Sequence, residues 1–282
     1  MSLSSNQLDA FFATARHLSF SKAAKELYVT QSALSQRITK LEGELNSNLF
    51  IRGLGKLRLT PMGIRLLKYV KVRDELETEF LSEVHDSMEG ELTGMIRIAG
   101  YSSVLRSIII PAAAGFLKEH PRVRCDFQSR EMMNLPELLL HSEVDFIVTN
   151  SHINRPEVIS KELCIEENVL VQSKKHKQRN HFMLDHDADD MTTESFFKMQ
   201  SQKPPEYERI FFDEIYGLLD GVANGLGRAV VSKHLITPSL NVEIVKKYKP
   251  MKNKVMLHYQ SLPHTARVKK QFIRHLNSYF SK

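Results

Sequence analysis

A predicted helix over residues 31–45 carries side chains of the types that contact DNA. Its apolar side is formed by residues at a helical spacing, Leu34, Ile38, Leu41 and Leu45. Its opposite side is polar without being acidic and presents Ser32, Ser35, Gln36, Thr39 and Lys40, with Arg37 at the flank. Hydroxyl, amide and cationic groups hydrogen-bond base edges or neutralise phosphates, so this composition suits the major groove. Thr30 is placed to cap the first turn.

Two earlier helices are expected to support this one. An apolar face at Leu8, Phe11, Phe12 and Ala15 predicts the first, and Ser21 is the expected N-cap of the second. Helix pairs of this kind also occur in ordinary protein cores, so the pattern alone leaves a scaffold role open.

A two-stranded wing is predicted over residues 49–61, with Gly53 and Gly55 in its turn. Its cations Arg52, Lys56 and Arg58 would contact backbone phosphates, which positions a domain on DNA without reading its sequence. The full set of candidate DNA-binding residues is Ser21, Gln31, Ser32, Ser35, Gln36, Arg37, Lys40, Arg52, Lys56 and Arg58.

Length and charge are compatible with two or three domains and with a nucleic-acid partner. The chain has 282 residues, 42% of them hydrophobic, which is enough to bury more than one core. The net charge is +6 and unevenly distributed: residues 1–60 hold eight basic and four acidic side chains, whereas residues 61–89 hold four and seven. A basic first domain permits binding to nucleic acid.

Neither a secretory signal nor a membrane-spanning segment is expected. The apolar stretch from Leu8 to Ala15 is interrupted by Asp9, and no apolar run is long enough to span a bilayer. Cys125 and Cys164 are too few for a disulfide framework, which fits a reducing cytoplasm. The two cysteines could form a redox-sensing pair, but the favoured interpretation of Cys125 is a small buried residue in a strand.

A long helix is predicted over residues 61–89, with Pro61 in its first turn and Gly90 after its end. An apolar stripe follows its length through Met62, Leu66, Tyr69, Val72, Leu76, Phe80, Val84 and Met88. A single exposed helix has no use for such a stripe, so packing against a partner helix is favoured over packing within the same chain.

From residue 90 the pattern changes to alternating strands and helices. Strands are predicted at 92–100, 122–130 and 144–150, with helices at 103–120 and 135–143 between them. This order predicts a parallel sheet covered by helices.

Polar residues gather where these strands end, which is where open α/β sheets bind ligands. Tyr101, Ser102 and Ser103 begin a helix whose free N–H groups would attract a carboxylate, although simple capping is the alternative. Thr149 and Asn150 should face the same cleft. Ser201 and Gln202 follow a further expected strand and complete the candidate effector site.

The sequence contains no recognisable catalytic set. His176, His181 and His186 lie among aspartates, but their spacing does not share a helix face and matches no HExxH pattern, so a solvated loop is favoured over a metal site. A GxSxG motif is absent, and Gly225-Leu226-Gly227 comes too late in the chain to begin a dinucleotide-binding unit. We therefore expect no catalytic residue, metal or cofactor.

The motif AAKELYVTQSALSQRITKLEGELNSNLFIRGLGKLRLTPMG, residues 23–63, resembles the N-terminal region of LysR-type transcriptional regulators almost position by position. The matching parts are Ala23-Ala24 and Leu27, Gln31 to Ser35, Leu41-Glu42, Leu49-Phe50 with Arg52, and Leu59-Thr60 with Gly63. The segments RLLKYVKVRDELETEFL and FMLDHDADDMTTESFFKMQ further resemble the ArgP branch of this family, whose members respond to basic amino acids.

The resemblance implies an α/β protein of three parts. These are an N-terminal winged helix-turn-helix domain at 1–60, a dimerising linker helix at 61–89 and a C-terminal effector domain built like a two-lobed, type 2 periplasmic binding protein. Its first lobe would comprise 90–152 plus 258–282, and its second lobe 153–257.

The function implied by the resemblance is that of a cytoplasmic regulator, not an enzyme. It would bind double-stranded DNA as a homodimer or homotetramer, respond to a small-molecule effector with an amino acid as the candidate, and have RNA polymerase as a further partner, without a membrane. The alternative is a small-solute-binding protein or enzyme of the periplasmic-binding-protein fold without DNA function. Salt-dependent binding to duplex DNA would distinguish the two.

Overall fold

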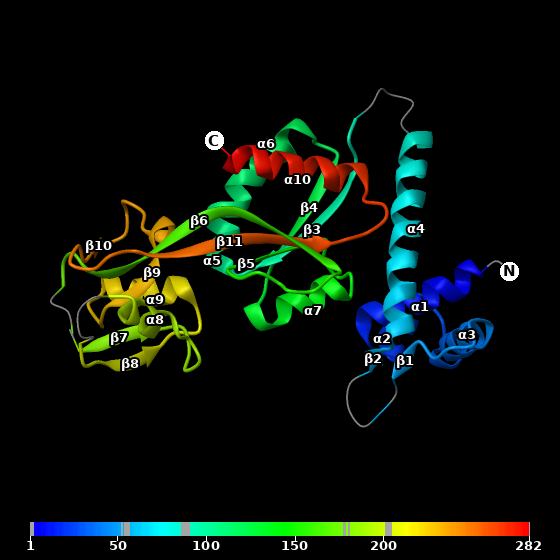
Figure 1. Cartoon of the computed structure of the whole chain (residues 1–282), viewed down its shortest axis with the longest axis horizontal. Helices are drawn as coiled ribbons and strands as arrows, with labels where there is room; N and C mark the ends of the chain where they lie inside the picture. Colours follow the sequence, from blue (N-terminus) through cyan, green and yellow to red (C-terminus); the bar gives the residue numbers. More distant parts are fainter. Residues whose placement is uncertain are drawn as a thin grey trace.

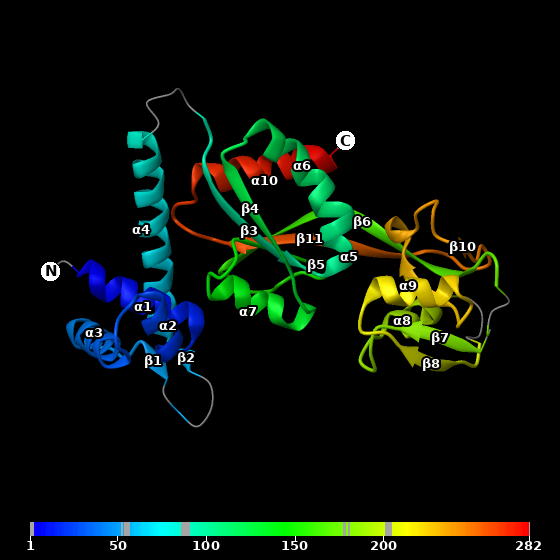
Figure 2. The ribbon, with the colours of Figure 1, turned by 180° about the vertical axis from the view of Figure 1, so that it is seen from behind.

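The structure is a computed structural model and describes residues 3–51, 53, 57–85, 91–176, 179, 181–200 and 205–281. Figures 1 and 2 show a small helical domain with a wing, then the long helix α4, then a two-lobed α/β domain. This is the fold class that the sequence predicts.

Three helices and a short hairpin form the winged domain. Its core joins all of them, and the fully buried side chains include Phe11, Leu34, Ile38, Leu41 and Leu49. The hairpin strands pair antiparallel, with Phe50 opposite Leu59. The elements are α1 (Ser5–His17), α2 (Phe20–Glu26), α3 (Gln31–Glu44), β1 (Phe50–Ile51) and β2 (Arg58–Leu59).

Helix α2 begins earlier than the sequence predicts. Ser19, not Ser21, is its N-cap, because the Ser19 hydroxyl accepts the N–H of Lys22 at 3.3 Å. Both serines have the chemistry of a cap. Packing of Phe20 against the core, with its ring 6.0 Å from that of Phe50, places the start of the helix at the earlier residue.

Helix α4 (Pro61–His85) uses different faces for different neighbours. Leu66, Leu67 and Val70 are buried in the core of the winged domain. The prediction that Leu66 belongs to one partner-facing stripe is therefore wrong. Other members of that stripe, Tyr69 and Phe80 among them, remain exposed, whereas Val84 and Met88 lie outside the described side chains.

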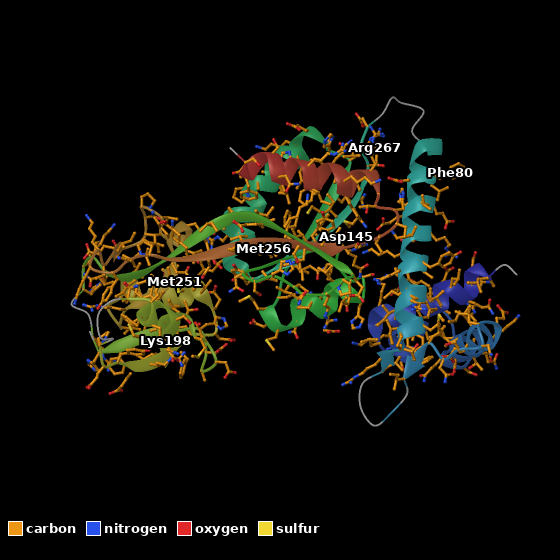
Figure 3. All side chains as sticks on the ribbon, in the orientation of Figure 1. Phe80, Asp145, Lys198, Met251, Met256 and Arg267 are labelled. Carbon is orange, nitrogen blue, oxygen red and sulfur yellow. The ribbon has the colours of Figure 1, made fainter. Side chains whose placement is uncertain are left out.

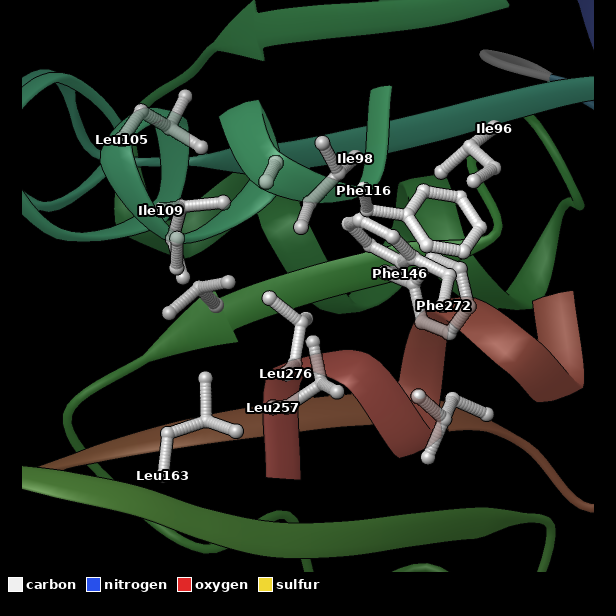
Figure 4. Packing of buried hydrophobic residues seen from close by; sticks show 14 of the residues in the cluster. Ile96, Ile98, Leu105, Ile109, Phe116, Phe146, Leu163, Leu257, Phe272 and Leu276 are labelled. Carbon is white, nitrogen blue, oxygen red and sulfur yellow. The ribbon is translucent and has the colours of Figure 1, made fainter. Parts of the chain in front are cut away.

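The first lobe of the α/β domain is a sheet between helices (Figure 1). Strands β3, β4 and β5 are parallel as predicted, but β11 runs antiparallel between β5 and β6, so the sheet is mixed. Phe116, Phe146 and Phe272 meet at the centre of its core (Figure 4). The elements are β3 (Gly94–Gly100), α5 (Ser102–Val104), a π-helical turn (Leu105–Ile109), α6 (Ile110–Glu119), β4 (Val123–Ser129), a 3-10 turn (Met132–Asn134), α7 (Leu135–Leu140), β5 (Phe146–Thr149) and α10 (Arg267–Phe280).

Two long antiparallel strands, β6 (Val158–Ser173) and β11 (Met251–Gln260), connect the lobes. Leu163 and Val255 pack in the core of the first lobe, whereas Val169 packs in that of the second. The boundary between the lobes thus lies within these strands. Part of the segment 153–257, which the sequence assigns to the second lobe, therefore packs in the first lobe. The second lobe adds β7 (Phe182–Asp185), α8 (Thr192–Lys198), β8 (Glu208–Phe211), α9 (Ile215–Ala223), β9 (Ala229–Ser232), a 3-10 turn (Lys233–Leu235) and β10 (Val242–Ile244).

Candidate functional sites

Helix α3 is divided into a buried face and an exposed polar face. Leu34, Ile38 and Leu41 are fully buried, and Leu45 is half-buried. The exposed residues are Gln31, Ser32, Gln36, Thr39 and Lys40, with Ser35 and Arg37 half-buried between the two faces. The Thr30 hydroxyl accepts the N–H of Ala33 at 3.1 Å, which confirms the predicted cap.

Side-chain hydrogen bonds hold α3 in place at both of its ends. Ser21 of α2 donates to Oε1 of Gln31 at 2.9 Å, at the exposed start of α3. Near its end, Oε1 of Glu42 accepts the N–H of Leu49 at 2.8 Å, which fixes the helix to the wing. These bonds position the polar face relative to the rest of the domain.

The wing is fastened to the start of α4. Thr60 donates through its hydroxyl to the carbonyl of Asn48 at 2.7 Å and accepts the N–H of Gly63 at 3.0 Å. A side chain at Gly63 would meet the Leu49 carbonyl, so only glycine fits there. Arg58 is exposed on β2, whereas Arg52 and Lys56 lie outside the described residues.

A chain of polar contacts crosses between the lobes beside the end of β3; we call it the interlobe network. Its members are Tyr101, Ser103, Ser107, Glu166, Asn168, Ser232 and His234. The Tyr101 hydroxyl donates to Oε1 of Glu166 at 3.3 Å, and Ser232 donates to Oε2 at 2.9 Å. His234 lies between that carboxylate, at 3.0 Å, and the Ser107 hydroxyl, at 2.8 Å. The network therefore joins residues of both lobes.

Tyr101 and Ser103 of this network are candidate effector residues from the sequence, whereas Glu166, Ser232 and His234 were not predicted. These residues come from separate elements, so no local spacing connects them. Burial, with the Glu166 carboxylate beside it, raises the pKa of Tyr101, so its hydroxyl stays protonated as a donor. Glu166 is itself buried and places a carboxylate between the lobes.

The remaining predicted effector residues divide into three groups. Ser102 is half-buried at the start of α5, where Tyr101 supplies no side-chain cap. Thr149 is buried and lies 2.8 Å from Nε2 of His258, while Asn150 is exposed. Burial, together with nearby His152, lowers the pKa of His258 to about 4, so its ring is neutral at pH 7. Ser201 and Gln202 lie outside the described residues.

In the second lobe, Arg209 holds the segment 185–190, which contains His186, by hydrogen bonds. Arg209 donates to Asp185, which is buried and also accepts the Thr193 hydroxyl at 2.5 Å. The same guanidinium donates to the carbonyls of Asp187 and Asp190 at 3.0 and 2.6 Å. Among the residues that the structure describes, no group of three or more His, Cys, Asp or Glu is arranged to hold a metal ion.

Neither cysteine has the environment of a reactive thiol. Burial raises the pKa of Cys125 to about 12 and that of Cys164 to about 11, so both are protonated at pH 7. Both are free and half-buried. Within the described part of the chain, no helix is long and apolar enough to cross a membrane.

Comparisons with known proteins place both domains. Residues 5–64 match the model of the bacterial regulatory helix-turn-helix protein, lysR family, and residues 89–281 match the LysR substrate binding domain. The chain is 32% identical over 178 residues to the HTH-type transcriptional regulator CfxR of Cupriavidus necator, covering 62% of this chain and 54% of that protein. It is 34% identical over 118 residues to DsdC of Escherichia coli, covering 42% and 37%. The chain thus spans about half the length, or less, of these curated relatives.

Solved structures share the fold over almost the whole chain. ArgP from Mycobacterium tuberculosis has a TM-score of 0.77 at 20% identity and covers 99% of this chain and 98% of its own. LysG from Corynebacterium glutamicum with bound effector Arg has a TM-score of 0.71 at 16% identity and covers 98% and 97%. From these matches, this chain belongs to the LysR family of bacterial helix-turn-helix regulators and contains both the helix-turn-helix and the substrate-binding domain of that family.

Proposed function

We propose that this protein is a DNA-binding transcriptional regulator that works in the cytoplasm and needs no cofactor. The observation that carries the proposal is the division of α3, whose buried face anchors it and whose exposed face holds hydrogen-bonding and cationic groups. A family structure, CbnR complexed with its target DNA, matches this chain with a TM-score of 0.56 at 16% identity and covers 99% of each chain.

Capture of genomic DNA fragments by the purified protein, followed by sequencing, tests this proposal. Affinity for a retained fragment should fall steeply as salt rises, because cations that neutralise phosphates release counterions. A solute-binding protein without DNA function would show no salt-dependent affinity for duplex DNA.

The active form in this proposal is a homodimer joined through α4. Two such dimers can assemble into a homotetramer. Met62, Tyr69, Leu76 and Phe80 are exposed along one side of the helix, and Phe80 is 63% exposed. The first three recur at the heptad spacing of paired helices. Two copies of this face would bury each other. RNA polymerase is the further partner, since a regulator bound beside a promoter acts on it.

The effector in this proposal is a small amino acid bound in the cleft between the lobes. The start of α5, where Tyr101 makes no side-chain cap and Ser102 and Ser103 carry hydroxyl groups, suits its carboxylate. The buried carboxylate of Glu166 suits a cationic side chain. Closure of the lobes on the ligand would shift the population of domain arrangements and so alter operator binding. Thermal-shift screening of the amino acids tests this, and stabilisation by none of them would exclude the ligand class.

A further inference from the structure

The linker helix is attached to the first lobe through buried charges. Four side chains form what we call the joint network: Lys71 and Glu75 of α4, Asp145 before β5, and Lys269 of α10. Nζ of Lys269 lies 2.6 Å from Oε1 of Glu75 and 2.7 Å from Oδ1 of Asp145. Lys71 approaches the same Asp145 oxygen at 3.9 Å. Lys269 thus bridges a carboxylate of the linker helix and a carboxylate of the lobe.

The network lies out of water and is matched in charge. The side chains of Glu75 and Asp145 are only 7% and 5% exposed. Although burial opposes it, the ammonium groups of Lys269 and Lys71 lower the pKa of Asp145. Despite burial, Asp145 and Glu75 raise the pKa of Lys269, so its ammonium group stays protonated at pH 7. Buried ions tolerate few arrangements, because each needs its partner at short range.

The linker helix also caps α10. Oε2 of Glu75 accepts the N–H of Ala266 at 3.1 Å, and Glu79 accepts the N–H of Arg267. The two carboxylates therefore satisfy free N–H groups at the start of α10. Helix α10 continues into the core of the lobe through Phe272 and Leu276, so the helix is anchored in that lobe. Figure 3 shows Asp145 and Arg267 on the side of the lobe that faces α4.

The other attachment of α4 is mainly apolar, with one ion pair at its edge, from Arg73 to Asp9 at 2.8 Å. Leu66, Leu67 and Val70 lie in the core of the winged domain, so this end of α4 is packed into that domain. Beside the joint network, a cavity of about 320 Å³ lies among α4, β3 and α10, with Asp74, Thr78 and Arg97 in its lining. The ion pairs of Lys269 and the hydrogen bonds that cap α10 thus set the direction of α4 relative to the lobe, because the cavity beside them leaves little apolar packing there.

We propose that Lys269 is a positioning residue that fixes the angle between the linker helix and the first lobe, and so sets the spacing at which paired winged domains meet DNA. The inference rests on the proposed function. An apolar contact could slide, but a bridge of one ammonium to two buried carboxylates selects a single register.

The angle is tested in Lys269→Met, with Lys269→Arg as the conservative variant and Lys270→Met as the control at the exposed neighbour. Spin labels on cysteines at Lys25 of α2 and Lys118 of α6, with Cys125 and Cys164 replaced by serine, report the distance between the two bodies by pulsed electron resonance. Labelled chains are diluted with unlabelled chains so that distances within one chain dominate. We expect a narrow distribution in the wild type, Lys269→Arg and Lys270→Met and a broad or displaced one in Lys269→Met.

Glu75→Gln is the second variant, because its amide oxygen still caps α10 while the charge is lost. It carries the test if melting shows that Lys269→Met does not fold. An unchanged distribution in the folded variants overturns the inference.

DNA spacing gives the second readout. On a retained genomic fragment, the wild type should prefer the natural separation of two half-sites over one lengthened by roughly 5 base pairs, about half a helical turn. Lys269→Met should reduce that preference roughly tenfold while leaving affinity for a single half-site unchanged. An unchanged spacing preference contradicts the positioning role. Absence of duplex binding by the wild type would instead contradict the proposed function.

Discussion

The hydroxyl of Tyr101 donates a hydrogen bond to Oε1 of Glu166 at 3.3 Å, from the end of β3 to the middle of β6. The second oxygen of the same carboxylate accepts from Ser232 at 2.9 Å. A buried carboxyl group with donors on both oxygens lies at the centre of the interlobe network, and replacing it tests the class of ligand.

Glu166→Gln should discriminate between cationic and neutral amino acids. Loss of the charge should weaken binding of lysine or arginine by about 1.5–3 kcal/mol, the usual worth of a hydrogen bond to a charged group, and should leave neutral amino acids little changed. Calorimetric titration measures both, with Glu208→Gln at an exposed site as the control. Equal losses for both ligand classes would mean that Glu166 holds the cleft together without contacting the ligand.

Helix α3 could be predicted from the sequence because its signal is local. Leu34, Ile38 and Leu41 recur at the helical period, and a cap at Thr30 precedes them, so one segment specifies both faces. The interlobe network could not be predicted in the same detail. Glu166 and His234 come from different elements and meet only through the sheet topology.

The linker helix lies between these two cases. Its periodicity predicted a helix and an apolar stripe, but a period allows more than one face to be apolar. Leu66 packs in the winged domain while Tyr69 stays exposed. The charged positions Lys71 and Glu75 are buried, which sequence rules for charged residues do not anticipate unless their partners are known.

Gln36→Ala tests the exposed face of α3. Removal of an amide that can hydrogen-bond a base edge should weaken operator binding by roughly 1–3 kcal/mol and leave the melting temperature unchanged. Leu34→Asp should instead unfold the winged domain, because a carboxylate would be buried in its core. Fluorescence titration against the operator and a scrambled duplex measures the difference. Unaltered operator preference in Gln36→Ala would show that the face is wrongly assigned.

Arg58→Ala tests whether the wing positions the domain on DNA without reading the base sequence. The exposed guanidinium on β2 would neutralise one phosphate, so affinity should fall for all duplexes alike and the salt slope should shrink by about one unit. The same titrations over a range of salt concentrations measure it. Lys118→Ala, an exposed cation on α6, is the control. A loss confined to one sequence would assign Arg58 to base reading.

A paired charge on α4 tests the dimer. Leu76 and Phe80 are each worth about 1.5–3 kcal/mol when buried, so Leu76→Glu with Phe80→Glu should dissociate the dimer and abolish binding to two half-sites. Sedimentation velocity measures the assembly, with Glu77→Gln at an exposed neighbouring position as the control. An unaltered oligomer in the double variant would place the interface elsewhere.

Lys71→Met tests the cation that lies farther from Asp145 in the joint network, through the pH dependence of stability. Burial lowers the pKa of Lys71 from 10.5 to about 8, with partial compensation by Asp145. Between these values the unfolded chain keeps a proton that the native chain has released, so this residue makes the free energy of unfolding rise with pH. The stability of the wild type relative to Lys71→Met should therefore increase by roughly 1–3 kcal/mol as pH is raised across that window.

Urea unfolding over a pH series measures this difference. Lys269 is present in both proteins, so the difference between them reports Lys71 together with its repulsion of Lys269. Lys68→Met, at a half-buried position of the same helix, is the matched control substitution. If the curves of wild type and Lys71→Met stay parallel, Lys71 is not buried as a charge between α4 and Asp145, and the bridge from Lys269 holds the joint without it.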